Sequence, residues 1–358
     1  MTQHVPFSNH PIFIGALAES LPEWLKTRNY SQVFLLADVH TDRLCRSLLP
    51  VEVAGAYTIG EHMEQALLTK VHGMEVLKTI QSCEAIWQAM FEARLDRKAL
   101  VINLGGGVVG DMGGFCAATY KRGIDFVQVP TTLLAMTDAA IGGKLGVDFN
   151  SIKNAVGVFQ NPAAVFIDPF FLKTLPEREL RSGFAEVIKH ALIGDRTLWQ
   201  RIQTMLVQSL SATAWDELLE ASIAVKTKIV SEDPREAGIR ALLNFGHTIG
   251  HALESFFLQT EQPLTHGEAI AIGMLCESPE DTTATLAQTI LRFFPHRQIP
   301  ESAFPALWKL MEQDKKNTSG TVRMAVPDAE PFSMQWQVLE REEAYRRLWT
   351  YNGLNFSN

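Results

Sequence analysis

The sequence has few cysteines, and none of them is spaced as a pair. The 358 residues include Cys45, Cys83, Cys116 and Cys276, which are scattered and lack the Cys-x-x-Cys spacing of cysteine zinc sites. Neither a disulfide framework nor a cysteine metal site is therefore indicated. Reduced thiols of this kind suit a cytoplasmic protein.

Long apolar runs and basic clusters are also missing. No stretch approaches the length that spans a membrane, and no charged segment followed by an apolar one opens the chain. The formal net charge is −8, and no Lys/Arg run compensates for it. We therefore expect a cytoplasmic protein without a membrane anchor and without a nucleic-acid partner.

The pattern of apolar residues along the chain changes near residue 180. Before that point, helical patterns such as residues 79–93 alternate with short apolar runs of strand type, at residues 32–37, 99–104, 126–129 and 163–167. After it, strand signals fade and amphipathic helical patterns dominate, as in residues 185–193 and 216–231.

A chain of this length is too long for one ordinary core, so two domains are expected. We predict a Rossmann-like α/β nucleotide-binding domain over residues 1–180 and a mainly α-helical metal- and substrate-binding domain over residues 181–358. The polar segment at residues 278–285 (SPEDTTAT) is expected to be a surface connection.

Three histidines and a glutamate suggest a metal site. His247 and His251 are four residues apart, so they share one face of a helix; His266 follows in THGEA, and Glu186 precedes in FAEVIKH. Catalytic zinc sites typically take three ligands from histidine and carboxylate. The plainer alternative is a polar pair that caps or bridges helices, because the HExxH motif is absent.

A glycine-rich turn follows the apolar run ALVINL. The letters GGGVVGD at residues 105–111 fit the pattern GxGxxG, and a helix-compatible segment follows them. Glycine lets the backbone approach a pyrophosphate, and a helix N-terminus offers free N–H groups to it. Such a turn is as often only a site of tight packing between a strand and a helix.

Seven sequence blocks, taken together, resemble those of the 3-dehydroquinate synthase family. The blocks read, in order, LGGGVVGDMGGF, YKRG, VPTTLLAMTDAAIGGK, KNAVGVFQNP, FAEVIKH, RALLNFGHTIGH and THGEA, and the likeness as a whole runs from about residue 35 to about residue 330. The resemblance implies a two-domain plan shared with other sugar-phosphate cyclases and with glycerol and iron-dependent alcohol dehydrogenases.

The resemblance implies that NAD is the cofactor. The pyrophosphate would lie on the glycine turn, and Asp38 would accept from the adenosine ribose, which favours NAD over NADP. The positions that match family cofactor contacts are Asp38, Glu75, Lys78, Gly106, Gly107, Asp111, Thr131, Thr132, Leu134, Lys153, Phe171 and Thr174.

The resemblance also implies which residues bind the metal and which act on the substrate. Glu186, His247 and His266 match the ligands of zinc, for which cobalt could substitute. His251 then contacts the substrate and relays a proton, with Glu236 as its partner; a histidine that merely bonds a buried carbonyl is the alternative. The matched catalytic positions are Asp138, Lys144, Lys189, Glu236 and His251.

The implied substrate is 3-deoxy-D-arabino-heptulosonate 7-phosphate, whose phosphate and carboxylate require a cationic pocket. Arg240 and Lys226 match its carboxylate partners, whereas Arg122 matches an arginine that serves the neighbouring subunit of a homodimer. The matched substrate-binding positions are Arg122, Lys144, Asn154, Lys226, Arg240, Asn244 and one of the pair Lys315 and Lys316.

The implied reaction yields 3-dehydroquinate and phosphate, a step of the shikimate pathway to chorismate and the aromatic amino acids. NAD removes a hydride at C5, phosphate leaves, the hydride returns, and ring opening precedes an aldol closure. The alternatives are another sugar-phosphate cyclase, of the aminodehydroquinate, 2-deoxy-scyllo-inosose or sedulose type, a polyol dehydrogenase that releases NADH, and a noncatalytic NAD-binding paralogue.

Overall fold

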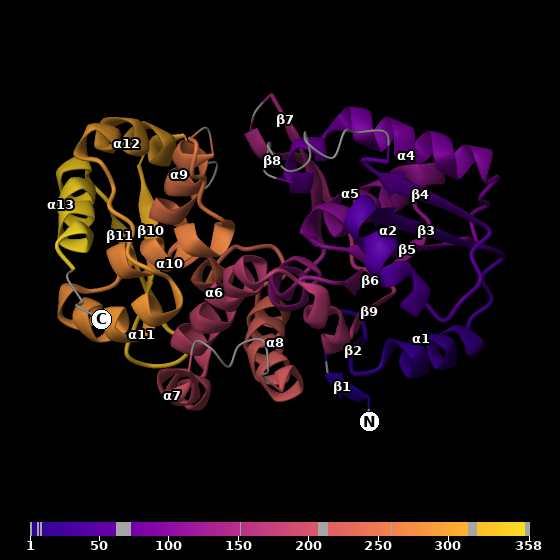
Figure 1. Cartoon of the computed structure of the whole chain (residues 1–358), viewed down its shortest axis with the longest axis horizontal. Coiled ribbons are helices and arrows are strands. Elements are labelled where there is room, and N and C mark those ends of the chain that lie inside the picture. The colour runs from indigo at the N-terminus through magenta and orange to yellow at the C-terminus, as the bar shows by residue number, and fades with distance from the viewer. Residues whose placement is uncertain are drawn as a thin grey trace. The chain divides into compact units, whose positions relative to one another are not determined.

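The protein divides into two compact units in a computed structural model (Figure 1). Unit 1 comprises Met1–Pro176 and Ala214–Thr227, and unit 2 comprises Glu177–Thr213 and Lys228–Asn358. The structure describes residues 2–5, 7, 9–61, 73–150, 152–206, 214–258, 260–313 and 321–354.

Unit 1 is built on a sheet that is parallel except at one edge. Among the described strands of this seven-stranded sheet, only β1 and β2 pair antiparallel. The order across the sheet is β1 (Gln3–Val5), β2 (Ile12–Ile14), β9 (Ala164–Ile167), β6 (Asp125–Pro130), β5 (Leu100–Gly105), β3 (Val33–Asp38) and β4 (Gly55–Ile59). The predicted α/β class is confirmed for this part of the chain.

The central strands are nearly continuous apolar runs, because helices and loops cover both faces of the sheet. All six residues of β5 are buried, as are five of the six in β3. The predicted strand segments each fall within one residue of an observed strand, and the predicted helix at residues 79–93 is α4 (Ile80–Glu92).

Two helices, α4 and α5 (Gly107–Thr119), pack on one face of this sheet through a core that includes Phe34, Val101 and Phe115. Gly113 of α5 permits the close approach. A Cβ there would lie 2.0 Å from Asn103 Oδ1 on β5 and 2.6 Å from Leu36 Cδ2 on β3. The glycine spacing of this segment therefore serves helix–sheet packing as well as the turn.

Shorter elements complete unit 1. They are α1 (Leu17–Lys26), α2 (Val39–Cys45), η1 (Arg46–Leu48), η2 (Gly73–Leu77), η3 (Tyr120–Arg122), the π-helical turn η4 (Ala135–Ala139), the antiparallel hairpin β7 (Lys144–Phe149) and β8 (Ile152–Phe159), and η5 (Pro169–Thr174).

Unit 2 is mainly helical, as predicted. Its helices are α6 (Glu177–Gly194), α7 (Arg196–Thr204), α9 (His247–Phe257), α10 (His266–Glu277), α11 (Glu280–Phe293), α12 (Phe304–Glu312) and α13 (Arg341–Asn352), with the short turns η7 (Ile239–Asn244) and η8 (Glu301–Ala303). Helix α8 (Trp215–Glu232) contributes its residues up to Thr227 to unit 1 and the rest to unit 2.

Two features of unit 2 differ from the sequence-based expectation. The hairpin of β10 (Arg323–Pro327) and β11 (Met334–Val338) has no counterpart in the predicted elements. The predicted surface connection at residues 278–285 is wrong, because α11 begins at Glu280. Pro279 occupies the N-cap position, and Glu280 and Asp281 place negative charge in the first turn, where the helix dipole favours it.

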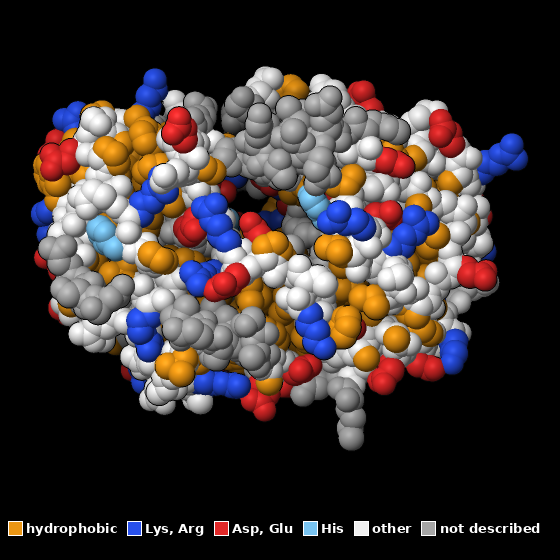
Figure 2. Space-filling view, viewed as in Figure 1, with side chains coloured by type: hydrophobic (Ala, Val, Ile, Leu, Met, Phe, Trp, Pro, Cys, Tyr) orange, Lys and Arg blue, Asp and Glu red, His pale blue; other side chains and the backbone are white. Residues whose placement is uncertain are grey.

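Cysteine burial and surface charge agree with the composition. All four cysteines are free and buried. On the face shown in Figure 2, Lys and Arg side chains of the described residues are interspersed with Asp and Glu. Among the described residues, no helix combines the length and apolar character needed to cross a membrane.

We predict that Gly113→Ala destabilises unit 1 by about 1–3 kcal/mol, because the new methyl group would overlap Asn103 and Leu36 in a packed interface. Chemical denaturation measures the change. Gly353→Ala is the matched control: Gly353 has αR backbone angles, and a Cβ there would meet only ordinary contacts at 3.5 Å. Equal midpoints for the two variants would contradict the packing argument.

Candidate metal centre and nucleotide site

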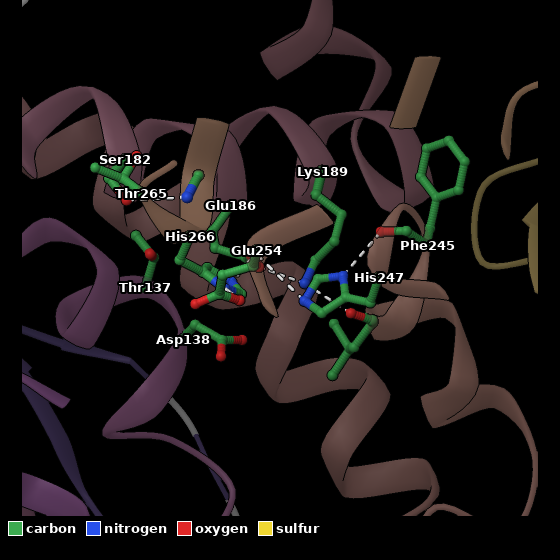
Figure 3. A network of polar contacts seen from close by, with 12 residues as sticks. Thr137, Asp138, Ser182, Glu186, Lys189, Phe245, His247, Glu254, Thr265 and His266 are labelled. Atoms are coloured by element: carbon green, nitrogen blue, oxygen red, sulfur yellow. Dashed lines mark hydrogen bonds and ion pairs between the residues drawn. The ribbon is translucent and has the colours of Figure 1, made fainter. Parts of the chain in front are cut away.

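Glu186, His247 and His266 converge within unit 2 (Figure 3). Glu186 Oε1 lies 3.6 Å from His247 Nε2 and 3.6 Å from His266 Nε2. Two ligands of one tetrahedral zinc ion lie about 3.3 Å apart, given metal–ligand bonds near 2.0–2.1 Å. Two imidazoles and one carboxylate at this spacing fit a zinc or cobalt ion and leave a coordination position for another ligand.

The second ring nitrogen of each histidine contacts an acceptor. His247 Nδ1 lies 3.0 Å from Phe245 O, and His266 Nδ1 lies 3.2 Å from Glu254 Oε2. A proton on Nδ1 satisfies both contacts and leaves the Nε2 lone pair of each ring directed toward Glu186. Metal-binding histidines usually have such outer partners, which fix the tautomer and the ring orientation.

The centre concentrates negative charge in a buried place. Glu186 has no exposed surface, and Lys189 Nζ, also buried, forms an ion pair with Glu186 Oε2 and donates to Leu243 O at 2.7 Å. Burial opposes protonation of His266, but Glu254 and Glu186 raise its pKa to about 10. A divalent cation would supply the compensating charge that this proton otherwise provides.

Local sequence explains how the ligands are placed. Glu186 and Lys189 are one turn apart on the buried face of α6. His266 is the first residue of α10, directly after a capping box in which Thr265 and Glu268 each accept from the backbone N–H of the other. The letters THGE carry that capping box, so the helix start at His266 is readable from the sequence.

The segment before α9 gathers three predicted polar residues. Asp233 accepts from the backbone N–H groups of Ala237, Gly238 and Arg240 at 2.7–3.1 Å. Burial opposes its ionisation, but these donors lower the pKa of Asp233. Within this loop Arg240 donates to Pro234 O at 2.5 Å, and Asn244 Nδ2 donates to Glu236 Oε1 at 2.5 Å.

His251 lies one turn after His247 on α9. Its ring centroid is 4.9 Å from that of His247 and 5.9 Å from that of His266. His251 therefore neighbours the three candidate ligands. Its partnership with Glu236 stays a prediction.

In unit 1, the glycine turn forms a small hollow at the carboxyl end of β5. Its lining includes Gly105, Gly106, Gly107, Gly110 and Ala139. Gly106 is the N-cap of α5 and has no side chain to cap that helix, and a Cβ there would lie 3.2 Å from Thr132 Cγ2. Bare backbone at the start of a 13-residue helix fits the pyrophosphate of a dinucleotide.

Asp38 lies at the same end of the sheet, where the parallel strands have their carboxyl ends. It ends β3, which pairs with β5 so that Ala37 faces Leu104. Its Oδ1 accepts from the N–H groups of His40 and Thr41 at 2.8 and 2.9 Å and so caps α2. The carboxylate is therefore held at the strand end where dinucleotide folds contact a ribose.

Lys78 joins several residues of the predicted sites. Its Nζ is 2.7 Å from Asp111 Oδ2 and 2.5 Å from Asn154 Oδ1, and its side chain is 5% exposed. Asp148 Oδ1 accepts from Asn154 N at 2.7 Å. Burial opposes the charge, but Asp111 and Glu75 raise the pKa of Lys78.

Asp138 and Lys226, both in unit 1, form a second close pair. Lys226 Nζ is 2.5 Å from both the carbonyl oxygen and Oδ1 of Asp138. Asp138 lies in the π-helical turn η4, and Lys226 lies on α8. The ammonium group thus holds the carboxylate and the backbone of the turn together.

The remaining predicted residues occupy defined places in unit 1. Glu75 and Lys153 are 3.6 Å apart, Thr131 N donates to Gly105 O at 3.0 Å, and Thr174 Oγ1 donates to Phe171 O at 3.2 Å. Leu134 is the N-cap of η4, Lys144 begins β7, and Arg122 ends η3. Lys315 and Lys316 lie outside the described residues.

Backbone angles mark three of the predicted site residues. Arg122, Asn154 and Glu236 have φ of 71°, 50° and 61°, in the left-handed region that residues other than glycine rarely adopt. Such conformations cost free energy and cluster at binding and catalytic sites. Sequence reasoning did not anticipate this feature, because none of the three is glycine.

Sequence reasoning also missed Glu254. This residue contacts His266 Nδ1 and lies seven positions after His247 and three after His251 on α9. A polar residue that continues the histidine face of a helix is a signal that could have identified it.

Comparison with known proteins identifies the family. A model described as 3-dehydroquinate synthase N-terminal matches residues 68–182, and one described as 3-dehydroquinate synthase C-terminal matches residues 183–317. The chain belongs to the 3-dehydroquinate synthase family. The predicted resemblance is confirmed.

Relatives within the 3-dehydroquinate synthase family align over most of the chain. The 3-dehydroquinate synthase of Parabacteroides distasonis is 37% identical over 319 residues, which are 87% of this chain and 88% of the relative. That of Geobacillus thermodenitrificans is 40% identical over 332 residues, 88% of each.

A solved structure named for a different activity shows the same fold. The 2-epi-5-epi-valiolone synthase ValA of Streptomyces hygroscopicus, with NAD+ and Zn2+ bound, superposes with a TM-score of 0.81. The match covers 98% of this chain and 99% of ValA, at 22% identity.

We predict that Lys78→Met destabilises unit 1 by about 3 kcal/mol, because it leaves the carboxylate of Asp111 without its buried cation. Urea denaturation of K78M, D111N and the double variant measures the coupling. The double variant should recover much of the loss.

Lys26→Met is the control for this prediction. It removes the partner of an exposed pair, since Lys26 and Glu23 are 68% and 71% exposed, and it should leave the midpoint unchanged. Additive losses from K78M and D111N would contradict the coupling.

Proposed function

We propose that this protein is a 3-dehydroquinate synthase that converts 3-deoxy-D-arabino-heptulosonate 7-phosphate to 3-dehydroquinate and phosphate. The observation that carries the proposal is family membership over residues 68–317, which include the convergent Glu186, His247 and His266. The reaction is a phosphate-eliminating cyclisation, and the protein would act in the shikimate pathway.

NAD would bind to unit 1. The bare glycine backbone at Gly106 and Gly107 suits a pyrophosphate, and Asp38 suits a ribose hydroxyl. Lys78 and Asp111 would support the same region, since each is held by the other. Bound NAD would supply reversible hydride transfer.

Glu186, His247 and His266 would hold a zinc or cobalt ion in unit 2, which when bound supplies a Lewis acid for a substrate hydroxyl. Lys189 balances the charge of Glu186 and holds the carboxylate in place. His251, which neighbours both ligand histidines, would accept and return a proton.

The remaining polar residues would bind the substrate. Arg240 is buried and held by the loop of Asp233, so its guanidinium is preorganised for a carboxylate. Lys226 would add a second positive charge, and its contact with Asp138 fixes both side chains. Lys144, Asn154 and Asn244 would take the phosphate, with Lys315 or Lys316 in the same role.

A second sugar-phosphate cyclase activity is the alternative that a specific observation favours, because ValA shares the fold. Two facts favour the synthase over it. The identity to 3-dehydroquinate synthases is 37–40% in the two relatives, against 22% to ValA. Lys226 and Arg240 also match the carboxylate partners of the family, which a sugar phosphate without a carboxylate would not need.

We further propose that the protein acts as a cytoplasmic homodimer. Four buried, free cysteines suit a reducing compartment. The hairpin of β7 and β8 exposes Phe149, Val156 and Phe159, and exposed large apolar side chains are typical of subunit interfaces.

The activity is tested by phosphate release from 3-deoxy-D-arabino-heptulosonate 7-phosphate, with the product coupled to a dehydroquinase. We expect phosphate and dehydroquinate in equal amounts, dependent on NAD, abolished by chelation and without net NADH. A stoichiometric rise of NADH would indicate a dehydrogenase instead. No turnover by protein replete with metal and NAD would assign another substrate.

The homodimer is tested by subunit complementation. If Arg122 serves the partner's site, mixing inactive Arg122→Ala with inactive His247→Ala should restore roughly a quarter of wild-type activity, because half of the dimers are mixed and each has one complete site. Mixing His247→Ala with His266→Ala is the matched control and should stay inactive. Failure of the first mixture, once subunit exchange is verified, would assign Arg122 to its own subunit.

A further inference from the structure

Glu277, the last residue of α10, is a fully buried carboxylate that accepts two hydrogen bonds from the start of α9. Its Oε2 accepts from Gly246 N at 2.9 Å, and its Oε1 accepts from Ile249 N at 2.8 Å. A buried carboxylate is costly unless hydrogen bonds compensate it, and N–H groups at a helix N-terminus do so well. Glu277 is therefore fixed to the first turn of the helix that carries His247.

Helix α9 needs this external partner, because its own N-cap is Gly246, which has no side chain. A larger residue is excluded there: φ is +79°, and a Cβ would lie 2.9 Å from Met274 N. The first N–H groups of a helix lack intrahelical acceptors. Glu277 supplies two acceptor oxygens from a different helix.

The contact reaches the candidate metal ligand through a single peptide group. Gly246 N–H and Phe245 C=O belong to the same planar peptide unit. The N–H end donates to Glu277, and the C=O end lies 3.0 Å from His247 Nδ1. A carboxylate at one end of a peptide fixes its plane and polarises the carbonyl, which strengthens the bond at the other end.

We propose that Glu277 is a positioning residue for the metal ligand His247. It acts through the peptide between Phe245 and Gly246, as Glu254 acts directly on His266. Each ligand histidine is then supported by a carboxylate, one directly and one through the backbone. The inference rests on the proposed metal site.

The test is the affinity of the protein for Co2+, measured by competition with a chelator. In Glu277→Gln, the side-chain amide keeps one acceptor and presents a donor to the other backbone N–H, so the peptide plane is released. Loss of an outer partner typically weakens metal binding about 10- to 100-fold. We expect a loss in this range, together with a shift of the visible Co2+ spectrum.

Asp195→Ala is the matched control. Asp195 Oδ1 accepts from the N–H groups of Thr197 and Leu198, both at 2.9 Å, at the start of α7. This cap uses the same chemistry, but α7 carries none of the candidate ligands. Both variants should lower the melting temperature, and only Glu277→Gln should weaken Co2+ binding.

The outcomes separate this inference from the proposed function. Unchanged Co2+ affinity in Glu277→Gln, or equal weakening in Asp195→Ala, would overturn the role of Glu277 and leave the metal site standing. A wild-type protein that binds no Co2+ would overturn both. If Glu277→Gln does not fold, Glu277→Asp, which keeps the charge but retracts it by one carbon, is judged by the same comparison.

Discussion

Direct backbone contact between α9 and α10 sets the geometry of the histidine centre. A Cβ at Gly273 would lie 1.9 Å from Gly246 O, so only glycine permits the observed approach there, and a Cβ at Gly250 would make a tight contact of 3.1 Å with Ala269 O. Because the helices touch in this way, His247 and His266 can both reach Glu186. The buried charge of Glu186 then requires Lys189 and a cationic group beside it. Helix packing and electrostatics in unit 2 thus depend on one contact between backbones.

Much of the fold is predictable because buried strands and helices have recognisable patterns of apolar residues in the sequence. Strands β3 and β5 are covered on both faces, so they read as unbroken apolar runs. The start of helix α11 was missed for the opposite reason: its first turns, EDTTAT, are polar and largely exposed, so they read as a surface connection. The hairpin of β10 and β11 was missed because each of its strands has only five residues, which gives little alternation to detect.

Some residues of the candidate site could be recognised from the sequence, and others only from the structure. The candidate ligands lie in compact sequence motifs, and the chemical requirement for histidine and carboxylate makes those motifs recognisable in the sequence. The groups that support the candidate ligands cannot be recognised in this way. Glu277, for example, accepts from main-chain N–H groups, which almost every residue has, so the contact leaves no motif in the sequence. Pairings such as Lys78 with Asn154 join residues 76 positions apart, and only the fold places them together. The left-handed backbone of Asn154 and Glu236 is likewise imposed by the surrounding structure.

Helix α10 begins with a candidate metal ligand and ends with the carboxylate that contacts the start of α9. One inserted residue within it would rotate one end against the other by about 100° and lengthen it by about 1.5 Å. His266 and Glu277 could not then both keep their contacts. The twelve-residue length of α10 therefore fixes the distance and the angle between the candidate ligand and the carboxylate that contacts α9, and an insertion within the helix would separate the two contacts.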